Sequence, residues 1–330
     1  MDVIRLPRRV SIIGSVAVVG KKEFEGPIGA DFDLHDDTEM FGMDTWEKAE
    51  SEMQRRALSL AIGKAKIDAT SLDAIFAGDL MNQCTGSAYG LKDFSVPYFG
   101  LYGACSTFAE SLMLSSLMIG AGYFTTCASV TSSHFCTAER QFRFPLEYGG
   151  QRTPTSQRTA TAAGAAILSA ENAGKVTITE VLPGRIVDKG ITDVNNMGAA
   201  MAPAAVDTLS RYFHATGTNP DGFDLIVTGD LGIEGHGILC DLLLSEGIDV
   251  RPVCNDCGLM LYSAESQDMH AGGSGCGCSA SVIAGHVIKR MEKGELRNVL
   301  YLATGALMSP GSLFQGLSIP GIAHLVHLSV

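Results

Sequence analysis

Leu72-Asp-Ala-Ile-Phe-Ala-Gly-Asp-Leu80 is repeated further along the chain as Phe223-Asp-Leu-Ile-Val-Thr-Gly-Asp-Leu231, with the final Gly-Asp-Leu unchanged. Each copy is a short apolar run that ends in Gly-Asp. A continuous apolar run of this length is typical of a parallel strand buried on both faces. The two stretches therefore predict two equivalent buried strands, each followed by a loop that begins at Gly-Asp.

A second pattern follows each copy of the repeated strand. Gly103-Ala-Cys105 opens a predicted helix over Phe108–Ile119, and a strand over Phe124–Val130 comes next. The same order returns with Gly275-Cys-Gly-Cys278, a helix over Ser281–Met291 and a further strand over Val299–Ala303. Two copies of strand, helix and strand predict two α/β halves packed together. We place the halves at residues 1–172 and 173–330.

The composition excludes several classes of protein. Among 330 residues, 46% are hydrophobic and only 18% are charged, which excludes a disordered chain. A formal net charge of −12 argues against nucleic acid or an anionic membrane surface as the main partner. Nine cysteines, scattered through a long chain, favour reduced thiols over a disulfide framework.

Two apolar stretches could be mistaken for membrane or targeting segments. Val10–Val19 follows three arginines, as in a signal peptide, but it is short and Lys21-Lys22-Glu23 stands where a small-residue cleavage site is needed. We predict a buried first strand there. Ser111–Ala138 contains no Asp, Glu, Lys or Arg and is long enough to suggest a membrane span, but Gly120-Ala-Gly122 interrupts it. We predict a buried helix and strand, with no membrane span.

The remaining elements follow from hydrophobic spacing and helix-start signals. Asp44-Thr-Trp-Glu47 resembles a capping box at the start of a helix over Trp46–Ala65. The other predicted elements are helices over Val206–His214 and Leu239–Leu244, and strands over Val176–Leu182 and Ile322–Leu328.

Cys105 is the leading candidate for a functional side chain. A cysteine at a helix N-terminus meets the positive end of the helix dipole and unpaired N–H groups, which favour its thiolate. The position suits a nucleophile or the anchoring of a ligand anion. The alternative is a small buried cysteine that fills tight helix packing.

Histidines and further cysteines supply weaker candidates. His134 ends the strand that follows the Cys105 helix, while His236 and His270 are predicted to lie in loops of the second half. A lone histidine is more often a structural hydrogen-bonding group than a catalyst. Cys254-Asn-Asp-Cys257 and Cys276-Gly-Cys278 together suggest a four-thiolate metal site, but the second pair lacks the usual zinc spacing, so the identity of any metal stays unknown.

The duplicated halves, with a cysteine on the buried helix of the first half, resemble the thiolase fold of condensing enzymes. That resemblance implies a layered αβαβα core built from two pseudo-duplicated α/β halves. In those enzymes this cysteine carries the acyl group, helped by a His–His or His–Asn pair from the second half. Here Thr228-Gly-Asp230 stands where acyl-carrier-protein synthases place a histidine after the repeated strand, and Gly275–Ser281 contains no Asn. The nucleophile is present, whereas its acid–base partners are not evident.

Longer sequence segments resemble the stage V sporulation protein AD family, whose members are not known as enzymes. They include Phe99-Gly-Leu-Tyr-Gly-Ala-Cys-Ser-Thr107, Thr131-Ser-Ser-His134, Met197-Gly-Ala-Ala-Met-Ala-Pro-Ala-Ala205, Asp256-Cys-Gly258 and Ala271-Gly-Gly-Ser-Gly-Cys276. The similarity spans nearly the whole chain.

This resemblance implies a subunit that binds dipicolinic acid, alone or with calcium, in the channel complex that moves dipicolinate during sporulation and germination. It implies a peripheral place on the spore inner membrane, docked on membrane-embedded subunits, with no transmembrane segment or signal peptide of its own. It further implies no cofactor other than calcium bound with the ligand. Thiolase-fold enzymes usually dimerise, so a homodimer remains an open expectation.

The residues carried over from the resemblance are Cys105 and the pair Asp256-Cys257, to which we add His134 and Asp230. Dipicolinate is a flat aromatic dianion, so its site needs an apolar slot with a few convergent donors. Asp256 would repel a bare dianion, and we expect it either to orient a neighbouring donor or to share a bridging calcium. Two other functions stay open: an acyltransferase that uses Cys105 as nucleophile with His134, His236 or His270 as base, and a purely structural scaffold.

Overall fold

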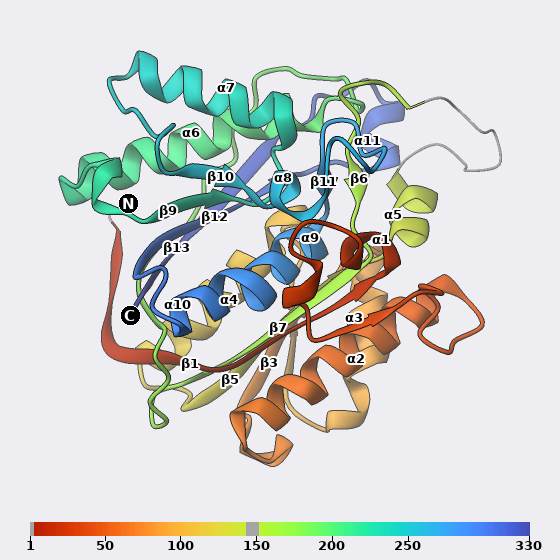
Figure 1. Ribbon diagram of the computed structural model, residues 1–330, viewed down its shortest axis with the longest axis vertical. Helices are drawn as coiled ribbons and strands as arrows, with labels where there is room; N and C mark the ends of the chain where they lie inside the picture. The colour runs from red at the N-terminus through yellow and green to blue at the C-terminus, as the bar shows by residue number, and fades with distance from the viewer. Residues whose placement is uncertain (1–2, 143–151) are drawn as a thin grey trace.

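The computed structural model describes residues 3–142 and 152–330 and shows an α/β protein built around one long, twisted sheet (Figure 1). Ten strands form a continuous path, and the edge strand of each half meets its counterpart where β1 pairs antiparallel with β8. In sheet order, the first half contributes β4 (Tyr98–Gly100), β3 (Ala74–Gly78), β5 (Thr126–Ser133), β7 (Ala162–Ser169) and β1 (Ile4–Gly20). The second half contributes β8 (Thr177–Leu182), β13 (Gly321–Ser329), β12 (Asn298–Ala306), β9 (Leu225–Thr228) and β10 (Cys254–Asp256).

The strand order shows the duplication directly. Numbered by their place in each half, both sets of strands run 1-5-4-2-3 from the β1–β8 junction outward. The pairings also repeat, with two antiparallel pairs next to the junction and two parallel pairs at the outer end of each half. Our proposed division at residues 172 and 173 lies in the connection between β7 and β8.

Three layers of helices enclose and separate the two halves of the sheet (Figure 1). Helices α2 (Trp46–Ala65) and α3 (Thr85–Leu91) cover the outer face of the first half, and α6 (Met197–Thr216) and α7 (Gly232–Ser245) cover that of the second. The central layer holds α4 (Thr107–Gly120) and a second helix made of α9 (Cys276–Ser281), a π-helical turn at Val282–Val287 and α10 (Ile288–Glu292). The short elements are α1 (Lys21–Phe24), α5 (Phe135–Phe142), α8 (Cys257–Leu261), α11 (Pro310–Phe314), β2 (Leu34–Asp36), β6 (Arg158–Thr159) and β11 (Gly273–Ser274).

The central helices lie between the two halves of the sheet because most of their residues are apolar or small and buried, as in α4 and in Cys276–Ser281. Helix α4 contacts β1, β3, β5 and β7 of one half and β12 and β13 of the other. The start of α9 approaches β7 so closely that a Cβ on Gly277 would lie 2.2 Å from the carbonyl oxygen of Ala162. A side chain there would force the helix off the sheet, so the small residues of the Gly275–Cys278 segment set the interlayer contact.

Most predicted elements are confirmed, with differences at their ends. The apolar stretch near the N-terminus forms β1, and Ser111–Ala138 divides into the end of α4, β5 and the start of α5. Helix α2 starts where predicted. Its N-cap residue is Thr45, whose hydroxyl accepts a hydrogen bond from the Lys48 amide, while Asp44 forms an ion pair with the Lys48 ammonium. Helix α6 begins nine residues before the predicted Val206, through a run of small residues.

Within the described parts of the chain, no helix is both long enough and apolar enough to cross a bilayer.

Candidate functional site

Cys105 lies in a tight turn that leads into α4. The hydroxyl of Ser106 donates to the Gly103 carbonyl at 2.6 Å, and the Thr107 hydroxyl donates to the Ala104 carbonyl at 2.6 Å. Strand β12 packs against this turn at Gly305, where a Cβ would lie 2.4 Å from the Gly103 carbonyl oxygen. The turn is thereby fixed between the two halves, with the Cys105 side chain at the helix N-terminus, 8% exposed.

Asp230 is the partner of Cys105. It follows β9 in the second half, and its buried carboxylate lies near enough to the Cys105 thiol to raise the pKa of that thiol. The same carboxylate accepts from the Gly275 amide at 2.9 Å, the Ser274 hydroxyl at 3.2 Å and the Thr304 hydroxyl at 3.0 Å. Three segments of the second half thus converge on one acid beneath the helix of the first half.

This pairing keeps the Cys105 thiol protonated. Burial raises the pKa of Cys105 well above its usual range, and the Asp230 carboxylate raises it further. The helix terminus was expected to favour the thiolate. That expectation is wrong, because desolvation and a neighbouring negative charge outweigh the dipole. Burial also raises the pKa of Asp230, to about 6, so this acid is largely ionised at neutral pH.

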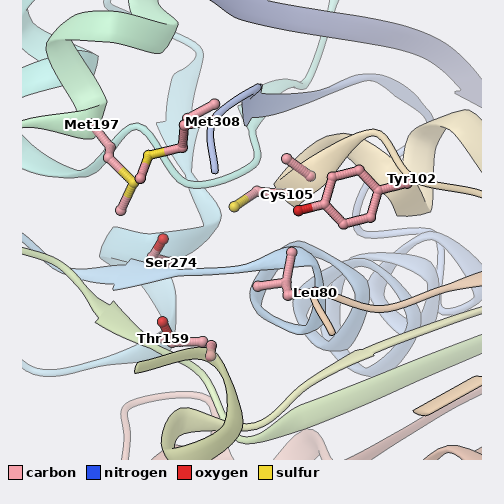
Figure 2. A pocket seen from close by; sticks show the side chains of 10 residues that line it. Leu80, Tyr102, Cys105, Thr159, Met197, Ser274 and Met308 are labelled. Atoms are coloured by element: carbon pink, nitrogen blue, oxygen red, sulfur yellow. The ribbon is translucent and has the colours of Figure 1, made fainter. Parts of the chain in front are cut away.

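A small cavity, partly open to solvent, lies above the Cys105 thiol (Figure 2). In Figure 2 the Tyr102 hydroxyl points toward Cys105, while Met197 and Met308 lie on the opposite side. The described residues that line the cavity are Leu80, Tyr102, Ala104, Cys105, Ala138, Thr159, Met197, Ser274, Ala306 and Met308. These described residues include no histidine, lysine, arginine or carboxylate, so the cavity offers apolar walls and hydroxyl or thiol groups.

Asp256 does not line this cavity. Its Oδ2 accepts from the Thr228 hydroxyl at 2.6 Å and the Leu231 amide at 2.8 Å. Its Oδ1 accepts from the Gly232 amide at 3.1 Å and the Gly258 amide at 3.0 Å. Asp256 therefore holds the starts of α7 and α8 in place, directly beside Asp230. Of the two expected roles, the geometry favours orienting neighbouring groups.

The remaining predicted cysteines separate in space. Cys257, Cys276 and Cys278 are fully buried, and burial raises the pKa of each thiol well above its usual range. Cys254 is half-buried and, in the described structure, groups with His236 and Cys240 rather than with these three. The four-thiolate site suggested by cysteine spacing is therefore wrong, and Cys257 is a core residue.

His134 has both ring nitrogens engaged away from Cys105. Its Nε2 donates to the Glu39 carbonyl at 2.9 Å, and its Nδ1 accepts from the Cys136 amide at 3.2 Å. Burial lowers the pKa of His134, which fits this neutral form. The structure brings His134 close to the start of α5 and does not place it at the cavity.

The two other histidines also have local partners. His270 bonds to the Thr153 carbonyl at 2.6 Å and lies 3.0 Å from the Asp268 carboxylate. The prediction of a loop at His236 is wrong, because this residue lies in the first turns of α7, with its Nε2 atom 4.0 Å from the Cys240 sulfur. Neither lines the cavity at Cys105, so the base that an acyltransferase needs is missing from the described lining.

Sequence reasoning found Cys105 and Asp230 but missed the residues that complete the site. Ser274 and Gly275 belong to the glycine-rich segment before the predicted second-half helix. Thr304 lies one residue beyond the predicted strand over Val299–Ala303, and nothing in the sequence marked it as a site residue. Tyr102, Met197 and Met308 come from three separate loops or helix ends. Their convergence depends on the packing of the two halves.

Comparisons with known proteins agree with this geometry. The family model for stage V sporulation protein AD matches residues 2–329. Stage V sporulation protein AD of Bacillus subtilis is 40% identical over 318 residues, covering 96% of this chain and 93% of that protein.

Solved structures show the same fold at much lower identity. The 3-oxoacyl-[acyl-carrier-protein] synthase III of Aquifex aeolicus superposes with a TM-score of 0.59 at 16% identity, covering 96% of this chain and 99% of that one. A variant of OleA from Xanthomonas campestris superposes with a TM-score of 0.62 at 14% identity, covering 97% and 96%. The fold is thiolase-like, and by its match over nearly the whole length the chain belongs to the stage V sporulation protein AD family.

Proposed function

We propose that this chain is a non-enzymatic subunit that binds dipicolinic acid, as its calcium chelate, in the spore dipicolinate channel complex. The cavity above Cys105 would be the binding site. The observation that carries the proposal is the buried Cys105 thiol beside the Asp230 carboxylate, because burial and this acid raise the pKa of the thiol and leave the expected nucleophile as a neutral wall of the cavity.

The shape and chemistry of the lining suit a flat aromatic ligand with polar edges. Leu80, Met197 and Met308 offer apolar contact for the two faces of a ring. Thioether side chains adapt to such a surface and make favourable contacts with aromatic rings. Tyr102 supplies a hydroxyl group for a carboxylate oxygen, whereas the hydroxyl groups of Ser274 and Thr159 already donate to Asp230 and Glu139.

Charge favours the chelate over the free dianion. The described lining holds no lysine or arginine, and the ionised Asp230 lies just beneath it. A bare dianion would meet repulsion without a compensating cation. A one-to-one complex of calcium with dipicolinate is neutral, so it avoids this cost.

The alternative, an acyltransferase, has a nucleophile without activation. Cys105 is protonated, and its nearest acid–base neighbour is a carboxylate that stabilises the thiol. General acid–base help is typically worth ~10²–10⁴ in rate. An enzyme of this type would need that help from a group that the described lining does not contain.

Binding variants test the proposed site. Ala306→Leu fills the cavity and is expected to abolish binding of calcium dipicolinate in calorimetric titration, while Tyr102→Phe removes one hydroxyl and weakens binding several-fold. Tyr123→Phe, at a tyrosine that is 76% exposed and outside the cavity, is the matched control. Equal affinities for all four proteins would place the ligand elsewhere.

Covalent trapping tests the alternative. The protein is incubated with acyl-CoA, and peptide mass spectrometry is used to look for a thioester on Cys105. The proposal predicts no adduct. A thioester on Cys105 that forms and turns over would instead establish an acyltransferase.

In the same proposal, the chain attaches peripherally to the spore inner membrane by docking on membrane-embedded subunits, and it acts in dipicolinate uptake during sporulation and release at germination. Alkaline extraction of spore membranes is expected to release it. Retention in the extracted bilayer would contradict peripheral attachment.

A further inference from the structure

A cluster of three potential metal ligands lies on the outer side of the second half, apart from the cavity at Cys105. His236 and Cys240 are four residues apart on α7, so both side chains project from one face of the helix. Cys254, the first residue of β10, faces them from the sheet. One ligand atom from each side chain lies within 4.8 Å of the other two.

The spacing needs little change to accept an ion. The His236 Nε2 and Cys240 Sγ atoms are 4.0 Å apart. In a tetrahedral zinc site, metal–sulfur bonds of about 2.3 Å and metal–nitrogen bonds of about 2.0 Å put neighbouring ligand atoms roughly 3.5 Å apart. Small rotations of the half-buried His236 and Cys254 side chains toward the buried Cys240 would therefore close the site.

The ligand atoms of the three side chains are close together and accessible. The His236 Nε2 atom already faces the Cys240 sulfur, and the Cys254 sulfur lies within 4.8 Å of both groups. His236 and Cys254 are half-buried, so an ion can reach the cluster from solvent.

We propose that His236, Cys240 and Cys254 bind a thiophilic divalent transition-metal ion of the zinc class, with one coordination position left for water or an external ligand. Two thiolates and one imidazole favour such an ion over calcium or magnesium, which prefer oxygen ligands. The ion would tie α7 to β10. It would be distinct from any calcium that enters the Cys105 cavity with dipicolinate.

Cobalt titration of the reduced, metal-free protein tests this directly, because Co²⁺ substitutes for Zn²⁺ and reports its ligands by absorption. We expect one Co²⁺ per chain, with thiolate charge-transfer and tetrahedral d–d bands. Bound Zn²⁺ should also raise the melting temperature. Cys240→Ser and Cys254→Ser should each weaken Co²⁺ binding by about tenfold or more.

Two further variants control for an unrelated cysteine and for poor folding of the cysteine variants. Cys136→Ser, at another half-buried cysteine far from the cluster in sequence, should leave the cobalt spectrum unchanged. His236→Asn changes a half-buried ligand at the surface and should weaken binding even if a cysteine variant folds poorly. The proposal is overturned if the wild-type protein shows no thiolate band, or if the band persists in Cys240→Ser and His236→Asn.

Discussion

The Cys105 thiol, from the first half of the chain, lies beside the buried carboxylate of Asp230, from the second half, and this acid raises the pKa of the thiol. The two residues come from different copies of the duplicated unit, and they meet because α4 lies between the two halves of the sheet. An acid at this place stabilises a neutral thiol, whereas an imidazole would accept its proton. The pair therefore accounts for a thiolase-like fold without an activated nucleophile.

Asp230→Asn should make Cys105 more reactive. Removing the neighbouring negative charge lowers the pKa of the thiol, since a like charge disfavours its ionisation. We expect alkylation by iodoacetamide at pH 8 to speed up by about tenfold, measured at Cys105 by mass spectrometry. Asp79→Asn, at the equivalent position of the first repeat, is the control and should leave that rate unchanged. An unaltered rate in Asp230→Asn would show that burial alone protects the thiol.

Asp256→Asn should destabilise the fold. Its carboxylate accepts four hydrogen bonds, including the amides of Leu231, Gly232 and Gly258, and an amide side chain cannot accept them all. The expected loss is about 2–3 kcal/mol in the free energy of unfolding, measured with urea. Asp249→Asn, which pairs only with Arg251 at the surface, should cause no measurable loss. Equal stability of both variants would refute the capping role of Asp256.

Glu23 should make stability fall as pH rises. Burial raises the pKa of Glu23 from its ordinary value to about 7, and Tyr262 and the Thr161 amide both bond to its carboxyl group. Between about pH 5 and 7 the native state holds a proton that the unfolded chain has lost, so the free energy of unfolding decreases by at most about 1.4 kcal/mol per pH unit.

Denaturant unfolding across this pH range measures the effect. Glu23→Gln should flatten the profile, because it carries no titrating proton, while Glu25→Gln at the neighbouring exposed position should not. A profile that keeps its slope in Glu23→Gln would assign the pH dependence to other groups.

Strand β4 is the outer edge of the first half of the sheet, and we propose that two copies of the chain form a homodimer by pairing at this strand. Among the described strands, β4 pairs only with β3, and its residues Tyr98 and Phe99 are 39% and 44% exposed. An edge strand that pairs with its own copy across a twofold axis satisfies its free backbone groups. Sedimentation should give a dimer that Tyr98→Lys weakens and Tyr123→Lys does not. A monomer at micromolar concentration would exclude this interface.

The sequence predicted the duplicated architecture because the repeated phrases lie in buried strands and helix starts, where local pattern reflects burial. Asp230 was found for the same reason, as the end of a repeated strand. The part that Asp256 plays in ligand binding stays a prediction, and sequence spacing could not show that four donors surround its carboxylate. Thr304, which bonds to Asp230, and Met308, which lines the cavity, could not be predicted, since both depend on the place of β12 within the sheet. Cys254 is remote in sequence from His236 and Cys240 on α7, and the pairing of β10 with β9 beneath α7 brings the three together.

The most direct test of the central proposal is calorimetric titration of the wild-type protein with dipicolinate, with and without equimolar calcium. The account predicts saturable one-to-one binding that is clearly tighter with calcium, because the described cavity lining offers no basic side chain to a free dianion. The absence of saturable binding under both conditions would contradict it.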